Sequence, residues 1–158
     1  MEKEIKRITI NFSYSNRGYF EDLYRDFIVF TKDNVLFMRM PLDQSLFSDK
    51  RKVRCYDMEL IFNEFGITRS DYDKNFSLLS KLVESLKDGK CKALDANLAS
   101  IDIDYNDETH KTIKDLSSYD ENNKHNFAVI LNIAYRYIPS EFKSEYVDED
   151  ETDEELEA

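Results

Sequence analysis

Glycine, proline, cysteine and tryptophan are scarce in this chain of 158 residues, which has 3 Gly, 2 Pro, 2 Cys and no Trp. Phosphate-cradling loops need glycine at fixed spacing and proline-rich ligands need runs of proline, so we set both classes of protein aside. Cys55 and Cys91 are far apart and neither belongs to a Cys-x-x-Cys pair. We therefore expect reduced, partly buried thiols and no structural zinc.

Long apolar runs are missing as well. The longest unbroken run covers only residues 127–131, whereas a helix that crosses a bilayer needs about 20 apolar residues. The chain starts with MEKEIKRITI, which alternates charged with apolar side chains and contains no signal-peptide core. We expect a cytoplasmic protein that does not associate with membranes.

Acidic side chains gather at one end of the chain. The whole chain has 33 acidic and 22 basic residues, and residues 145–158 hold nine of the acidic ones and no Lys or Arg. The remaining 24 acidic residues nearly balance the 22 basic ones. A DNA mimic carries about one negative charge per 1.7 Å of duplex axis over its folded surface, so this balance argues against mimicry of DNA. We expect one α+β domain over residues 1–144 and a mobile acidic tail over residues 145–158, because the tail has little apolar surface to bury.

Alternating apolar residues predict several strands. The pattern predicts a first strand at residues 8–14, a hairpin with strands at 27–30 and 35–40 that is closed by Pro41, and a further strand, SIDIDY, at 100–105. These strands provide most of an antiparallel sheet.

Residues 127–138 fit two periods at once. Phe127, Val129 and Leu131 continue an alternating pattern, while Phe127, Ile130 and Ala134 lie on one face of a helix. β-Branched and aromatic residues are frequent here, which favours a long strand over the helix.

Capping residues predict two consecutive helices. Asp57 can cap a first helix that Gly66 ends, and Thr68 with Asp71 resembles the capping box of a second helix that runs to Gly89. Weaker patterns predict a helical turn at 19–27, an irregular segment at 41–54, and a short helix pinned by Ile113, Leu116 and Tyr119. The predicted fold class is α+β, with an antiparallel sheet of about five strands packed against a central helical hairpin and an acidic C-terminal tail.

The stretch IFNEFGITRSDYDKNF, within residues 57–88, resembles the helix-turn-helix of DNA-binding proteins. Gly66 matches the turn glycine and Tyr72 an inward position of the second helix, while Phe62 and Asn75 depart from the pattern. The resemblance implies that the second helix contacts DNA. An ordinary helical hairpin explains the same residues.

Five polar residues between positions 102 and 108 are candidate metal ligands: Asp102, Asp104, Asn106, Asp107 and Glu108. Their opening spacing imitates a calcium loop, but the glycine and the last glutamate of such a loop are missing. On a strand, Asp102 and Asp104 point to one side and could hold Mg²⁺ with His110 as a base, or simply be solvated. His125 lies in polar, loop-like sequence. We expect no metal, no cofactor and no catalytic residues.

A basic cluster precedes the first predicted helix and consists of Lys50, Arg51, Lys52 and Arg54. With aromatic strands and an acidic tail, the chain resembles several single-stranded-DNA-binding proteins. That resemblance implies a nucleic-acid-binding protein whose tail competes with the ligand or recruits partners.

The favoured hypothesis is a non-catalytic protein-binding module. Seven acidic residues of the tail form the predicted contact with a basic surface of a larger, nucleic-acid-processing partner: Asp148, Glu149, Asp150, Glu151, Asp153, Glu154 and Glu155. The composition, low in Gly, Pro and Ala, suggests an AT-rich bacterial or phage genome, so an immunity protein or a phage-encoded inhibitor is a specific form of this hypothesis.

Overall fold

The computed structural model describes residues 3–12, 24–41, 51–89, 99–116 and 123–145. These residues form an antiparallel sheet of six strands with three α-helices, which confirms the expected α+β class. The tail residues 146–158 lie outside the described residues, as do Lys50 and Cys91. No described helix is both long enough and apolar enough to cross a membrane.

The strands form one sheet in the order β4-β3-β2-β1-β5-β6, and every neighbouring pair is antiparallel. The predicted hairpin is confirmed, because β2 and β3 pair along their whole length around a turn at residues 31–33. The strands are β1 (Ile5–Phe12), β2 (Tyr24–Phe30), β3 (Asn34–Pro41), β4 (Lys52–Asp57), β5 (Ala99–Tyr105) and β6 (His110–Leu116).

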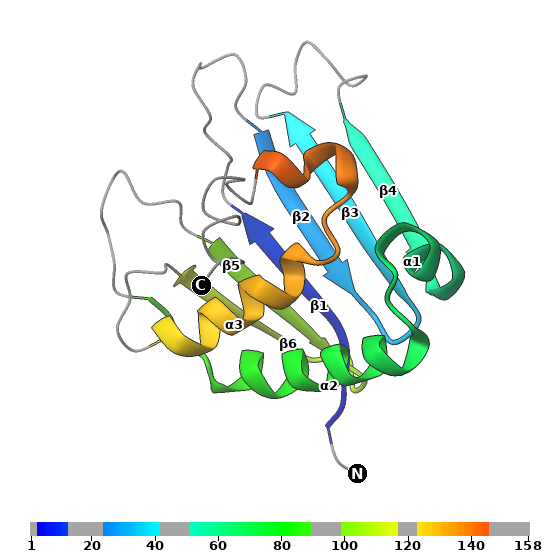
Figure 1. Ribbon diagram of the computed structural model, residues 1–158. Helices are drawn as coiled ribbons and strands as arrows, with labels where there is room; N and C mark the ends of the chain where they lie inside the picture. Colours follow the sequence, from blue (N-terminus) through cyan, green and yellow to red (C-terminus); the bar gives the residue numbers. More distant parts are fainter. Residues whose placement is uncertain (1–2, 13–23, 42–50, 90–98, 117–122, 146–158) are drawn as a thin grey trace, which may run out of the picture.

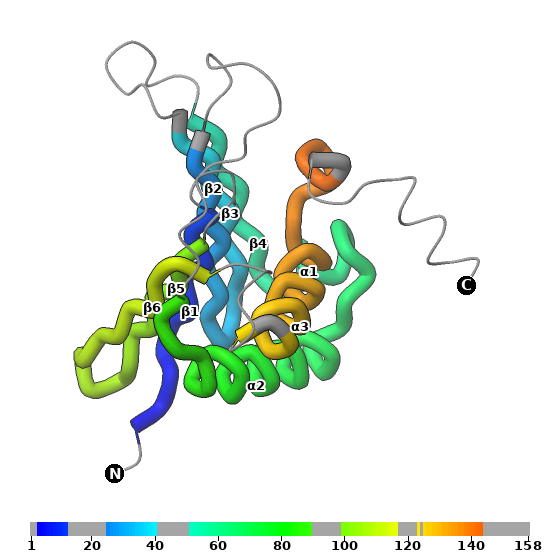
Figure 2. Tube along the Cα trace, turned by 90° about the vertical axis from the view of Figure 1, so that its left-hand side faces the viewer, coloured from blue at the N-terminus to red at the C-terminus, as the bar shows by residue number. Residues whose placement is uncertain are grey.

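All described helices lie on one face of the sheet (Figures 1 and 2). They are α1 (Met58–Phe65), α2 (Arg69–Ser85), α3 (Lys124–Tyr135) and a short 3-10 helix, η3 (Ser140–Glu145). The predicted caps are confirmed: the Asp57 side chain accepts a hydrogen bond from the Leu60 amide, and the Thr68 side chain accepts one from the Asp71 amide. Gly66 ends α1 with a φ of 70°, a conformation that costs glycine little.

An aromatic cluster joins the sheet to the helices. The ring of Tyr137, just after α3, makes edge contacts with Phe30 of β2, Phe65 of α1 and Tyr72 of α2 at centroid distances of 5.4, 5.9 and 5.7 Å. The hydroxyl groups of both tyrosines are satisfied, since Tyr72 donates to the Thr31 carbonyl and Tyr137 accepts from Asn75. Such contacts stabilise the cluster beyond the burial of apolar area.

The prediction of a strand at residues 127–138 is wrong, because α3 covers most of this range. Phe127, Ile130, Ile133 and Ala134 are buried, and they recur at the helical spacing of three and four residues. Packing of this face against α2 and within the common core outweighs the strand preference of the β-branched side chains.

Two further predictions are wrong at the borders of the sheet. Residues 52–54 form part of β4 rather than an irregular segment, and residues 110–116 form β6 rather than a short helix. Both are the outermost strands in the sheet order, and both carry lysine residues, as edge strands often do. The predicted helical turn at 19–27 is wrong for residues 24–27, which belong to β2, and its other residues lie outside the described part.

Candidate interaction surface

The second face of the sheet carries no described helix, and we call it the open face. Side chains alternate along each strand, so residues opposite one another in the register share this face. One such row runs Asp102, Thr9, Val29, Leu36, Cys55 from β5 to β4. The row changes from polar to apolar between β1 and β2.

The apolar half of the open face lies on β2, β3 and β4. Within this half, Phe27 is opposite Met38 and Val29 is opposite Leu36. These four side chains are half-buried but are not among the partly buried residues that pack against the core. The apolar half consists of Phe27, Val29, Leu36, Met38, Val53 and Cys55.

The apolar half becomes more exposed towards the edge of the sheet. Val53 of β4 is 39% exposed, and Cys55 is an exposed free thiol, so the expectation of a partly buried thiol is wrong for this residue. Solvated faces of antiparallel sheets are usually polar, and contiguous apolar patches on soluble proteins usually mark binding sites.

The polar half of the open face carries a connected hydrogen-bond network on β1, β5 and β6. Arg7 Nε donates to Asp104 Oδ2 at 3.0 Å, and His110 Nδ1 lies 2.8 Å from Asp104 Oδ1. His110 Nε2 lies 3.0 Å from Thr112 Oγ1, whose hydroxyl donates to Asp102 Oδ1 at 2.7 Å. The predicted shared side of Asp102 and Asp104, close to His110, is therefore confirmed.

The hydrogen bonds of this network favour a charged histidine. A protonated His110 donates from Nε2 to Thr112 while Thr112 donates to Asp102, whereas a neutral imidazole with its proton on Nδ1 would accept from Thr112 instead. His110 Nδ1 must be the donor towards Asp104, because the carboxylate only accepts. The hydrogen bond with Asp104 accordingly raises the pKa of His110, and the bond with His110 lowers the pKa of Asp104, with Arg7 adding to the effect.

A Ser-His-Asp type of triad needs a free lone pair on the imidazole, and a nucleophilic Thr112 would have to donate its proton to His110. The hydrogen bond from Thr112 to Asp102 competes with that donation, and the bond with Asp104 raises the pKa of His110, which favours the charged imidazole over a general base. Among the described residues, no group of three His, Cys, Asp or Glu side chains is placed to hold a metal ion.

The other residues of the calcium-loop motif form the turn between β5 and β6. Asn106 Oδ1 accepts from the Glu4 amide at 3.1 Å, and Asp107 Oδ1 accepts from the Thr109 amide at 3.0 Å. Glu108 has a φ of 69°. The oxygens of Asn106 and Asp107 are thus used to shape the hairpin.

The helix-turn-helix prediction finds its two helices but not their packing. Phe62, which stands where the helices should cross, is 55% exposed. The other departure from the motif, Asn75, donates to the buried Tyr137 hydroxyl at 2.7 Å, and α2 packs against α3. The helices therefore serve the core of the α+β domain.

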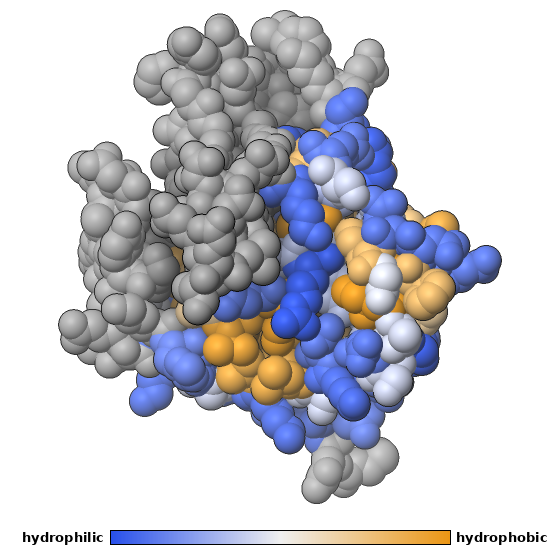
Figure 3. Space-filling model, viewed as in Figure 1, coloured by the Kyte–Doolittle hydropathy of each residue, from blue (hydrophilic) through white to orange (hydrophobic). Residues whose placement is uncertain are grey.

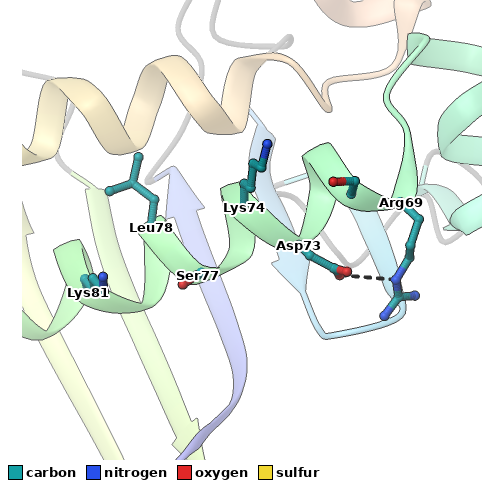
Figure 4. A pocket seen from close by; sticks show the side chains of 7 residues that line it. Arg69, Asp73, Lys74, Ser77, Leu78 and Lys81 are labelled. Carbon is teal, nitrogen blue, oxygen red and sulfur yellow. Dashed lines mark ion pairs between the residues drawn. The ribbon is translucent and has the colours of Figure 1, made fainter.

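A shallow groove runs along the outer side of α2, where Arg69 pairs with Asp73 while Lys74 and Leu78 point towards α3 (Figure 4). Arg69 also pairs with Asp33 at 3.0 Å. Lys74 has no ion pair with another described residue. Of the charged residues that line this groove, Arg69, Lys74 and Lys81 are basic and Asp73 is acidic.

On the helix side, exposed apolar side chains lie apart from one another. Apolar atoms gather over α1 and again where α2 and α3 meet (Figure 3). Leu60 and Phe62 of α1 are 47% and 55% exposed, and Leu78 of α2 is 42% exposed. Leu60 and Phe62 share the short helix α1 and Leu78 lies on α2, whereas the apolar half of the open face extends over three hydrogen-bonded strands.

The basic cluster is only partly free. Arg54 Nε donates to Glu141 Oε1 at 2.6 Å, and this hydrogen bond raises the pKa of Arg54. Arg51 and Lys52 are exposed, while Lys50 lies outside the described residues. The predicted nucleic-acid contact therefore loses one of its four cations to η3.

Comparisons with family models, curated proteins and solved structures give no match for this chain. The open face is therefore judged from its geometry. Sequence reasoning missed its apolar half, although a signal was present: residues 27–30 and 35–38 are unbroken apolar runs, which are typical of strands covered on both faces.

Proposed function

We propose that this protein is a non-catalytic protein-binding module that lays the apolar half of the open face on a larger partner. The observation that supports the proposal is the continuous apolar surface of Phe27, Val29, Leu36, Met38 and Val53 on a face that no described helix covers. Removing such side chains from water favours association by about 25 cal/mol per Å² of apolar area, before the entropic cost of binding.

The acidic tail specifies the kind of partner. Residues 145–158 carry nine acidic side chains and no basic one, so they attract a basic surface and accelerate encounter at low ionic strength. The partner we propose has an apolar patch beside a basic surface, as nucleic-acid-processing enzymes have beside their substrate clefts. In this form the protein is an inhibitor that covers such a cleft, made by a bacterium or a phage.

Site-specific photo-crosslinking tests the surface. Benzoylphenylalanine replaces Leu36 or Met38 in the apolar half, and Leu60 or Leu78 in matched controls on the helix side. In cells that make the protein, we expect one adduct of the same mass from positions 36 and 38 and none from positions 60 and 78. Equal adducts at all four positions, or none at 36 and 38, would refute the proposal.

The identity of the adduct shows which molecule occupies the open face. A partner that carries a basic surface supports the proposal, while an adduct of twice the mass of the chain shows a second copy on the open face and refutes it. With the purified partner, Met38→Glu should weaken binding by more than about tenfold, because a carboxylate is then buried against an apolar patch. Truncation after Ser144 should slow association and remove most of its salt dependence.

Nucleic-acid binding by the basic cluster is the alternative. It predicts that a gel shift with single- or double-stranded DNA depends on Arg51 and Lys52 and becomes stronger when the tail is removed. The engagement of Arg54 by Glu141 weighs against it. Retention of DNA that is abolished by Arg51→Glu with Lys52→Glu would favour this alternative over protein binding.

A further inference from the structure

The last described residues are fixed beside β4 by η3. The ring of Phe142 stacks on Phe37 at a centroid distance of 5.2 Å, and the Arg39 guanidinium lies 4.3 Å from the centre of the Phe142 ring. Glu141 accepts the hydrogen bond from Arg54 of β4. The tail therefore starts from a fixed position beside β4, a few residues after Glu141.

The neighbouring edge of the sheet is basic. Lys52 is opposite Arg39 in the register, and Arg54 is opposite Phe37, so both side chains of β4 lie on the side of the sheet that η3 covers. Lys52 and the preceding Arg51 are exposed and make no ion pair with another described residue. In the described part of the sheet no strand pairs with the outer edge of β4.

Charge and reach connect the two observations. Residues 145–158 carry nine acidic side chains and contain no Lys or Arg. An extended chain spans about 3.3–3.6 Å per residue, so the chain after Glu145 is long enough to reach Arg51 and Lys52. Tethering of this kind produces an effective concentration on the order of millimolar.

We propose that the edge formed by Arg51, Lys52 and Arg54 is a binding site for an extended acidic segment, and that its occupant is this chain's own tail, residues 146–158. Glu141 already neutralises Arg54, and the tail neutralises Arg51 and Lys52 in the same way. The bound tail shields the cations from other polyanions. A partner with a basic surface must compete with this edge for the tail.

Paramagnetic broadening tests the contact without any partner. A nitroxide is attached to Thr152→Cys in the full chain with Cys55→Ser and Cys91→Ser, and amide signals are compared with those of the reduced label. We expect the strongest loss of intensity at residues 51–54. We also expect recovery at about 1 M salt, where the Debye length falls to about 3 Å.

Charge reversal provides the matched control. Arg51→Glu with Lys52→Glu should abolish the broadening at β4, whereas Lys111→Glu with Lys114→Glu, the same change on the opposite edge strand, should leave it intact. All four side chains are exposed, so the amide spectra should otherwise be preserved. Broadening that persists after charge reversal at residues 51 and 52, or that is centred on β6 or α2, overturns the proposal.

A mixture of labelled and unlabelled chains separates the occupants. Spin-labelled protein without ¹⁵N is mixed with ¹⁵N protein that has no label. Loss of intensity at β4 in this mixture shows that the tail of a second copy occupies the edge, which overturns docking within one chain. Because no partner is present, failure here leaves the crosslinking result of the open face unaffected, and the reverse is also true.

Discussion

The two halves of the sheet differ in where their polar side chains lie. In β2 and β3 the core side holds the ion pair of Asp26 and Arg39, and the open side carries the apolar half, with the exposed Arg25 opposite Met40 at its end. In β5 and β6 the core side holds Ile103 and Ile113, and the open side carries the network around His110. One sheet thus shows both arrangements side by side.

Exposure to water explains the side chains on the open side of one half of the sheet but not those of the other half. The polar side chains around His110 satisfy one another and remain accessible to water, so the β5–β6 half is complete as it stands. The apolar side chains on the open side of β2 and β3 gain nothing from water. They are the side chains that the proposed binding partner would cover.

The largest expected effect comes from the ion pair on the core side. Asp26 is fully buried and accepts two hydrogen bonds from Arg39, at 2.9 and 3.0 Å. Asp26→Asn removes the buried carboxylate charge that pairs with Arg39, and we expect a loss of about 3–5 kcal/mol in the free energy of unfolding. Urea denaturation measures it.

A double substitution serves as the control. Asp26→Leu with Arg39→Met removes both charges and should restore most of the lost stability, because no charge is then left buried. A cost below about 1 kcal/mol for Asp26→Asn contradicts the importance of the pair.

The next effect compares apolar side chains of the two faces. Ile103 is fully buried on the core side, so Ile103→Ala should cost about 2–5 kcal/mol. Met38 lies half-buried on the open side, and Met38→Ala should cost about 1 kcal/mol while it weakens partner binding. Equal losses of stability in denaturation curves would show that the open face is part of the core.

A third effect is the pH dependence of the β5–β6 half. The pKa of His110 is raised from an ordinary value of 6.5, so its stabilisation is complete below that pH and is lost as the pH rises through the raised pKa. The pKa of Asp104 is lowered from 3.8, so its stabilisation is present above that pH and is lost as the pH falls through the lowered pKa. The network should therefore stabilise the fold most between about pH 4 and 6.5.

Thermal unfolding of His110→Gln measures this effect. The variant should lose the decline in Tm that the wild type shows above pH 6.5, because glutamine does not titrate. NMR titration should place the pKa of His110 above the ordinary histidine value of 6.5. An unchanged pH profile in the variant would contradict the charged state derived from the hydrogen bonds.

The smallest effect concerns the exposed ion pair in the β2–β4 region. Arg54 and Glu141 have side chains that are 38% and 48% exposed, so Arg54→Ala should cost at most about 1 kcal/mol. The loss should shrink with salt, unlike that of Asp26→Asn. A larger loss of stability that does not depend on salt would show that Arg54 contributes as a buried ion pair does.

Sequence patterns predicted the centre of the sheet better than its borders. Strands β1 and β5 alternate clearly, β2 and β3 contain apolar runs on either side of a polar turn, and α1 and α2 are marked by Asp57, Gly66 and Thr68. The edge strands β4 and β6 were missed because each buries few side chains and carries lysines that resemble loop sequence. Helix α3 was missed because only tertiary packing selects between its two periods.

The candidate site was predictable in part. The common side of Asp102 and Asp104 follows from strand alternation alone, and their contact with His110 follows once β6 is a strand. The pairing of Arg54 with Glu141 joins residues far apart in sequence and leaves no local pattern. The apolar half could have been inferred from the unbroken runs in β2 and β3, but the placement of all described helices on the other face could not.

The place of β1 in the sheet has a consequence for folding kinetics. Its inner residues Ile8 and Ile10 pair on one side with β2 and on the other with Ile103 and Ile101 of β5. During synthesis, one side of the first strand must wait until about residue 105 has left the ribosome. Closure of so long a loop slows folding, so the nascent chain exposes a strand edge that chaperones can recognise.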